Sequence, residues 1–170
     1  PAATVKEGEV LTVTIPAENF HTVAQMLRDD KEMQFDCLVC VTGADWGETM
    51  GVVYHLRSTV LGHEAVLRQE TADRENPMLP TVSDLWHSAN FNEREVFDYF
   101  GIRFVGHPDM RRLFLRNDWK GYPLRKDYDA NPELNPVPTT NEEAEDETEE
   151  IEFKDGKLEM CDHQLFDEKE

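Results

Sequence analysis

The stretch "NEREVFDYFG", residues 92–101, sets charged residues among apolar ones at helical intervals. Residues four apart lie on one face of a helix, so Glu93 shares a face with Phe97, and Arg94 shares one with Asp98. We therefore predict an ion pair between Arg94 and Asp98 within the helix. Glu93 falls on the apolar side, where a carboxylate without a partner is costly.

Two interpretations of Glu93 are open. As a buried general base, Glu93 would carry a raised pKa. As half of a structural ion pair, it would be joined across the following turn by Arg111 or Arg112. Structural ion-pair networks also perturb the pKa of carboxyl groups, so a perturbed carboxyl is not in itself catalytic. We favour the ion pair.

The rest of the chain up to about residue 105 alternates between strand and helix patterns. Apolar periodicity and β-branched residues predict strands at 9–15, 35–45, 50–58, 63–71 and 102–105, and helices at 16–30 and 84–100. The strands at 50–58 and 63–71 flank a short turn and predict a hairpin. Gly101 suits the end of the second helix, and Thr81 with Asp84 resembles a capping box at its start.

These elements predict an α+β fold. We expect a two-layer α/β domain with a mixed sheet at 1–105, followed by an extended irregular docking arm at 106–135 and an acidic, largely irregular tail at 136–170. Residues 139–150 are predicted to be disordered. Residues 151–160 regain alternation and predict a small hairpin or a segment lying along a partner; for 151–166, docking and disorder both remain open.

Charge is distributed very unevenly along the 170 residues, whose formal net charge is −19. Residues 129–170 hold sixteen acidic residues and three lysines, a net of −13. Residues 91–128 reverse the balance, with eight basic residues against six acidic ones. A chain with so small a basic field is not expected to bind nucleic acid.

The basic region begins with "GHPDMRR", residues 106–112. His107 is the best acid–base candidate among the six histidines, and Asp109 follows two residues later. Without a nucleophile in a recognisable elbow, this pair favours a histidine that fixes a turn by hydrogen bonds. Residue types common in interface cores then gather together: Met110, Arg111, Arg112, Phe114, Arg116, Trp119, Tyr122, Arg125 and Tyr128. This composition predicts a docking surface.

The three cysteines do not indicate a disulfide framework or a metal site. Cys37 and Cys40 have the spacing of redox and zinc sites, but they lie within a predicted buried strand, where positions three apart face opposite ways. Since no second Cys/His pair follows at zinc spacing, we expect core cysteines. Cys161 stands alone in the tail.

Other sites are not indicated by the sequence. It contains no nucleotide-, NAD- or flavin-binding fingerprint and no grouped cysteines for an iron–sulfur cluster. No apolar stretch reaches the length needed to span a bilayer, and the first ten residues lack the pattern of a signal peptide. We expect a protein of a reducing compartment.

The charged helix and the arm together resemble one family closely. The matching segments are "ERE" at 93–95, "DYFGI" at 98–102, "GHP" at 106–108, "RR" at 111–112 and "DWKGYPLRKDY" at 118–128. In order and spacing they are similar to the 30-kDa subunit (the C-type subunit of the bacterial enzyme) of proton-pumping NADH:quinone oxidoreductase, respiratory complex I. Looser similarity extends the resemblance to roughly residues 10–128. Two departures, Phe91 for tryptophan and Phe114 for an aliphatic residue, keep an apolar side chain.

The resemblance implies a non-catalytic structural and assembly subunit of the peripheral arm, on the cytoplasmic side of the bacterial inner membrane and without direct membrane insertion. It implies packing against a 49-kDa-type subunit and neighbouring iron–sulfur subunits, with FMN and the iron–sulfur clusters in those partners and no cofactor, metal or catalytic residue in this chain. The signature residues expected at the subunit interface are Glu93, Arg94, Glu95, Asp98, Gly101, Gly106, His107, Pro108, Arg111, Arg112, Trp119, Gly121, Pro123, Leu124, Arg125, Lys126 and Asp127.

Within this expectation, four basic residues of the arm pair with carboxylates: Arg111, Arg112, Arg125 and Lys126. Some of these carboxylates are internal, including Glu93 and Glu95, and others are on the partner. Two alternatives stay open. One is an equivalent scaffold subunit of a membrane-bound hydrogenase or a ferredoxin- or F420-linked complex. The other is a free-standing hydrolase that uses His107, Asp109 and Glu93.

Overall fold

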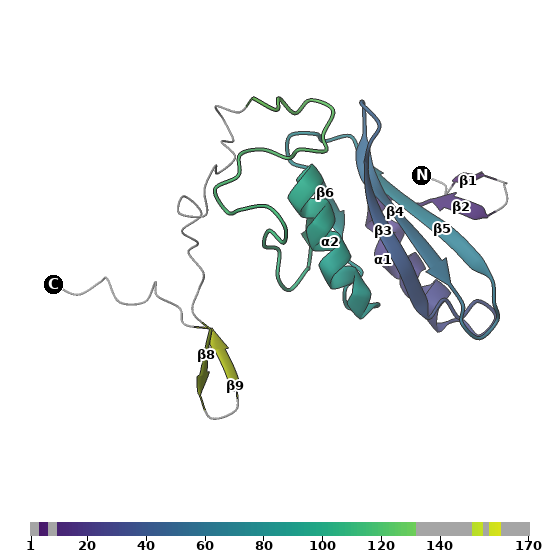
Figure 1. The fold of residues 1–170 in the computed structure, drawn as a ribbon. Coiled ribbons are helices and arrows are strands. Elements are labelled where there is room, and N and C mark those ends of the chain that lie inside the picture. The colour runs from purple at the N-terminus through teal and green to yellow at the C-terminus, as the bar shows by residue number, and fades with distance from the viewer. Residues whose placement is uncertain (1–3, 7–9, 132–150, 155–156, 161–170) are drawn as a thin grey trace. The chain divides into compact units, whose positions relative to one another are not determined.

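The computed structural model describes residues 4–6, 10–131, 151–154 and 157–160 (Figure 1). The chain divides into two compact units, residues 1–135 and 136–170. The predicted disorder at 139–150 and the docking of 161–166 fall outside the described residues, and so does Cys161.

One mixed sheet forms the centre of the first unit. Its strands are β1 (Thr4–Lys6), β2 (Leu11–Thr14), β3 (Cys37–Asp45), β4 (Met50–Arg57) and β5 (Glu64–Thr71), in the order β1-β2-β5-β4-β3. The pairing of β2 with β5 is parallel, and the other pairings are antiparallel. The mixed sheet and the β4–β5 hairpin are therefore confirmed.

Helices α1 (Ala17–Asp29) and α2 (His87–Phe100) cover one face of this sheet. Phe20 of α1 lies 4.9 Å, between ring centres, from Tyr54, a core-facing residue of β4. On the same face, α2 approaches β3 so closely that a Cβ built on Gly43 would lie 2.5 Å from a ring carbon of Phe100. Because both helices join a single apolar core with the sheet, the predicted two-layer α+β architecture is confirmed.

Three details of the prediction are wrong. No strand is predicted between residues 71 and 84, yet strand β6 (Met78–Pro80) lies there and pairs in parallel with β7 (Arg103–Val105) in a separate two-stranded sheet. Helix α2 begins at His87 rather than residue 84, after Trp86 and without a side-chain cap. Thr81 does not form the predicted capping box, because its hydroxyl bonds the carboxylate of Glu93.

The cysteines also differ from the prediction. The register of β3 against β4 shifts between Leu38 and Cys40, which marks a β-bulge. A bulge adds one residue to a strand and reverses the alternation of faces beyond it. Cys37 lies opposite the exposed Arg57 and Cys40 opposite the exposed His55, so both cysteines are on the outer face of the sheet. Both are half-buried rather than core residues.

After β7, the described part of the arm contains turns but no helix or strand up to residue 131. The chain enters this region through Gly101, which ends α2 with a φ of 75°, as predicted. In the second unit, β8 (Ile151–Lys154) pairs antiparallel with β9 (Lys157–Met160), which is the hairpin that the sequence offered as one of two alternatives; docking of this segment on a partner stays a prediction.

We predict that Gly101→Ala destabilises the fold more than Gly62→Ala. Both glycines have positive φ, 75° and 79°, but only at Gly101 would the new Cβ meet a side chain, the ring of Tyr122 at 2.5 Å. The left-handed backbone should cost about 1–2 kcal/mol at either site, and overpacking about 1–3 kcal/mol more at Gly101. Urea unfolding of the two variants measures the difference, and equal losses would contradict the close approach of Tyr122.

Candidate functional site

Three buried carboxylates of the domain lie against residues 106–128 of the arm. They are Asp45 at the end of β3 and Glu93 and Asp98 on α2. Their side chains are 2%, 0% and 0% exposed. Burial of three acidic groups is costly unless each receives hydrogen bonds, and each of them does.

Asp98 receives the largest number of bonds from the arm. Its Oδ2 accepts the backbone N–H groups of residues 113–115 at 3.1, 2.7 and 2.9 Å, and its Oδ1 accepts NH1 of Arg112 at 2.9 Å. Arg112 also donates to the carbonyls of Trp119 and Gly121, so one guanidinium ties two turns of the arm to the helix. Burial alone would raise the pKa of Asp98, but these donors outweigh it and the pKa is lowered.

The predicted Arg94–Asp98 pair is therefore wrong. Arg94 instead donates to the carbonyls of Arg111 and Arg112, at 3.2 and 3.1 Å, and pairs with Asp109 at 3.4 Å. An exposed pair within a helix gains only about 0.2–0.5 kcal/mol. Because the arm folds back over α2, it offers several hydrogen bonds to Arg94 and several to Asp98. Each of these two side chains therefore turns toward the arm rather than toward the other.

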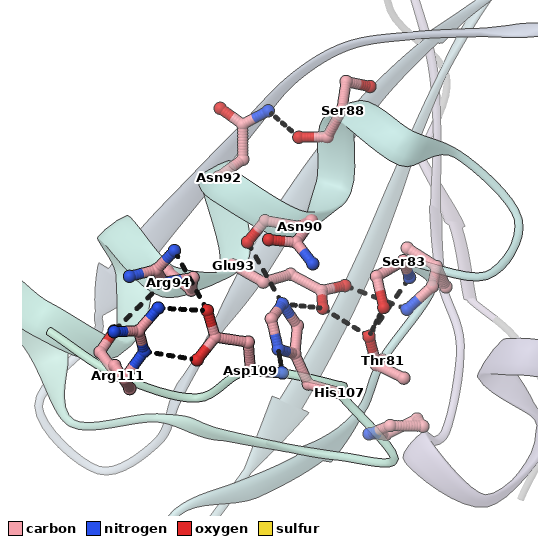
Figure 2. A network of polar contacts seen from close by, with 12 residues as sticks. Thr81, Ser83, Ser88, Asn90, Asn92, Glu93, Arg94, His107, Asp109 and Arg111 are labelled. Carbon is pink, nitrogen blue, oxygen red and sulfur yellow. Dashed lines mark hydrogen bonds and ion pairs between the residues drawn. The ribbon is translucent and has the colours of Figure 1, made fainter. Parts of the chain in front are cut away.

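Glu93 is enclosed by the loop before α2 and by the first turn of the arm (Figure 2). Its carboxylate accepts the hydroxyl of Thr81 and, at 2.9 Å, the backbone N–H of Val82. Burial raises the pKa of Glu93 to about 7; the two hydrogen bonds offset part of this rise, and the charge of Asp84 adds to it. Arg112, predicted as one of its partners, reaches Asp98 instead.

His107 closes the turn above Glu93. The ring is fully buried, with Nε2 at 3.1 Å from the carbonyl of Asn90 and Nδ1 at 3.0 Å from the backbone nitrogen of Asp109 (Figure 2). A carbonyl only accepts and an N–H only donates, so these contacts assign a neutral imidazole with its proton on Nε2. His107 thus has the turn-fixing role predicted from the sequence.

Asp45 holds the far end of the arm. Its carboxylate forms a two-pronged pair with Arg74, at 2.6 and 2.9 Å, and accepts the backbone N–H of Lys126 at 2.9 Å. Arg125 donates to the carbonyl of Arg74 at 2.7 Å and pairs with Asp127 at 3.0 Å. The bond from Arg74 lowers the pKa of Asp45 far below its usual range.

Sequence reasoning missed Arg74 and Asp45 and assigned Thr81 to a capping box, because nothing local identifies a residue that bonds a partner far away in the sequence. The only sequence signal was for Asp45, an acidic residue at the end of an apolar strand. Among the predicted residues, Glu95 is exposed on α2, and Arg111 pairs with Asp109 at 2.7 Å. The positions of these residues do not test whether they form a subunit interface, which stays a prediction.

The geometry disfavours the hydrolase alternative. The side chains of His107 and Glu93 are both fully buried, and the bonds of both ring nitrogens are used to hold the turn. A substrate cannot reach either group in this conformation. Within the described residues, no cluster of three or more His, Cys, Asp or Glu side chains is arranged to hold a metal ion.

We predict that Asp98→Asn releases the central part of the arm. The amide cannot accept from Arg112 and from three N–H groups at once, and breaking a buried ion pair costs about 3–5 kcal/mol. Amide hydrogen exchange at residues 113–115 should accelerate strongly. Asp118→Asn is the matched control, since Asp118 pairs with Arg116 while 67% exposed, where about 0–1 kcal/mol is expected. Unchanged exchange in Asp98→Asn would contradict the anchoring role.

We also predict that the stability of the wild type relative to Glu93→Gln falls as pH rises from 5 to 8, a comparison that cancels the titration of the other groups. The pKa of Glu93 is raised from 4.5 to about 7 on folding, so the folded state binds the proton more tightly. Its contribution is present below pH 4.5 and lost as pH rises through 7, about 3 kcal/mol at most. Asp45 and Asp98 have lowered pKa values and change stability only in more acidic solution. Denaturation curves that fall in parallel for both proteins would contradict this assignment.

Comparisons with known proteins agree on one family. Residues 13–133 match the family described as "Respiratory-chain NADH dehydrogenase, 30 Kd subunit". The NADH-quinone oxidoreductase C/D subunit of Phocaeicola vulgatus is 54% identical over 160 residues, which cover 93% of this chain and 30% of that protein. The C-type subunit of the same enzyme from Chlorobium phaeobacteroides is 38% identical over 117 residues, covering 67% of this chain and 70% of that protein.

A solved structure agrees with these sequence relatives. A chain of the membrane-bound sulfane sulfur reductase, an archaeal respiratory membrane complex, superposes with a TM-score of 0.65 at 28% identity, covering 76% of this chain and 79% of that one. The chain spans less than a third of the length of its C/D relatives. None of the helices in the described residues is long and apolar enough to cross a membrane. The chain belongs to the 30-kDa subunit family of respiratory-chain NADH dehydrogenases, the C-type subunits of complex I.

Proposed function

We propose that this chain is a non-catalytic structural subunit of the peripheral arm of an NADH:quinone oxidoreductase, on the cytoplasmic side of the membrane, and that it docks on the 49-kDa-type subunit. The observation that carries the proposal is that relatives 50–54% identical to this chain are named as C/D subunits. This chain spans only 30% of the length of each of them. In this proposal the D portion of those relatives corresponds to the 49-kDa-type subunit. Joining two segments in one polypeptide keeps them at high effective concentration, which favours segments that pack together.

The internal bonding of the arm supports a structural role. Asp45 and Asp98 accept hydrogen bonds from the arm, and Arg94 and Arg112 are bonded to backbone carbonyls within the chain. In this proposal FMN and the iron–sulfur clusters belong to partner subunits, because such clusters need grouped cysteine ligands. Electron transfer and quinone reduction then also belong to those partners.

Exposed apolar side chains on the arm are the proposed contact with the 49-kDa-type subunit. Phe114 is 61% exposed and stacks on Tyr99 of α2 with ring centres 5.9 Å apart. Leu124 is 55% exposed, and its backbone N–H donates to the carbonyl of Tyr99 at 3.1 Å. Both are held in fixed positions beside one helix residue, so docking would cost little ordering entropy.

A second candidate is the same scaffold in a different respiratory complex. The superposition with a chain of the archaeal sulfane sulfur reductase favours it. The higher identity to quinone oxidoreductase subunits favours the first candidate. Purification of the native complex distinguishes the two, because the redox subunits that accompany the chain identify the reaction.

We predict that Phe114→Asp and Leu124→Asp reduce co-purification with the 49-kDa-type subunit at least ten-fold. A buried charge within an apolar contact is costly, whereas each isolated variant should keep its circular dichroism spectrum and melting temperature. Val60→Asp is the matched control, because Val60 is 69% exposed in the turn between β4 and β5, away from the arm. Equal recovery of the 49-kDa-type subunit with all three variants would overturn this contact.

A further inference from the structure

The contact between Glu93 and His107 joins α2 to the first turn of the arm, yet it is incomplete. Both side chains are fully buried, and Nε2 of His107 lies 4.0 Å from Oε2 of Glu93, too far for a hydrogen bond. The imidazole instead donates to the carbonyl of Asn90 at 3.1 Å. Glu93 is thus covered by the imidazole without receiving a hydrogen bond from it.

The turn constrains where a proton can reside. Nδ1 of His107 accepts the backbone N–H of Asp109 at 3.0 Å, and a proton on Nδ1 would set two N–H groups against each other. The closed turn therefore needs a neutral imidazole. A titratable proton shared by this pair must lie on Glu93, where the protonated carboxyl can still bond Thr81.

The surroundings oppose a negative charge on Glu93. Asp84, in the loop before α2, is acidic, and its charge raises the pKa of Glu93; Asp109, in the arm, is paired with Arg94 and Arg111. The cation nearest along the helix, Arg94, is bonded to Asp109 and to carbonyls of the arm. From β4, Tyr54 presents a buried phenol whose pKa is raised, first by burial and then by the charge of Glu93.

We propose that Glu93 and His107 form a proton-operated latch for the arm. When the Glu93 carboxyl is protonated, residues 106–109 stay closed over it. When Glu93 releases its proton to solvent, the buried carboxylate has two donors among the described residues, Thr81 and Val82, and neither is a cation. Opening the 106–109 turn admits water to the carboxylate and breaks the bond between Asp109 and His107. The latch acts within the chain and does not depend on the identity of the docking partner.

The test is amide hydrogen exchange of Asp109 in the full chain, measured by NMR from pH 6 to 8.5 and corrected for the intrinsic pH dependence of exchange. In the wild type, the protection factor of Asp109 should fall at least ten-fold across this range. In Glu93→Gln it should stay constant within two-fold, because the amide remains neutral. Glu95→Gln is the matched control and should behave as the wild type, since Glu95 is exposed two residues further along α2.

A second variant tests the mechanism without changing the acid. Thr81→Val removes a hydroxyl that stabilises the carboxylate, so the midpoint of opening should move to higher pH. The ¹⁵N shift of Nδ1 in His107 should remain that of an unprotonated nitrogen while the turn is closed. A constant protection factor in the wild type, an equal fall in Glu93→Gln, or an unmoved midpoint in Thr81→Val would each overturn the latch.

Discussion

The hydrogen bonds that Asp98 accepts from residues 113–115 and from Arg112 are the interaction on which the arm depends. A segment without helix or strand cannot satisfy its own backbone N–H groups through a ladder, and buried N–H groups must find acceptors. The domain supplies them as carboxylates at fixed positions on α2 and at the end of β3. The irregular path of residues 106–128 is therefore fixed by these carboxylates of the domain together with Arg112 and His107 of the arm itself.

This arrangement changes how the charges of the chain are understood. The arginines of the charged helix and the arm were expected to pair with carboxylates, some of them on a partner subunit. In the structure, Arg94 of α2 and Arg112 donate to carbonyls of the arm, and Arg125 donates to a carbonyl of the domain. The guanidinium groups of these three arginines therefore bind the arm to the domain. What remains exposed includes apolar side chains such as Phe114 and Leu124, and interface cores are depleted in charge. This is why the proposed contact is centred on apolar residues of the arm rather than on its arginines.

Local patterns predicted most elements, although not β6, and they did not predict the partners of the charged side chains. The β4–β5 hairpin, the mixed sheet and the end of α2 at Gly101 followed from periodicity and turn chemistry. The faces of Cys37 and Cys40 did not, because one bulged residue reverses alternation and leaves no trace in composition. The prediction that Asp98 pairs with Arg94 was also wrong. An ion pair four residues apart on a helix stabilises it by about a few tenths of a kcal/mol, whereas the folded arm donates four hydrogen bonds to Asp98. Information of that kind lies in tertiary contacts between residues far apart in sequence.

Glu93 and Asp98 show how the number of donors decides the state of a buried acid. They lie on one helix about 7.5 Å apart along its axis, and both side chains are fully buried. Asp98 receives three N–H groups and a guanidinium, so its pKa is lowered and it stays ionised at neutral pH. Glu93 receives one hydroxyl and one N–H, so burial prevails and its pKa rises to about 7. In the proposed latch, one helix therefore carries a permanent anchor for the middle of the arm and a pH-dependent contact for its first turn, and loss of a proton from Glu93 loosens the second while the first holds.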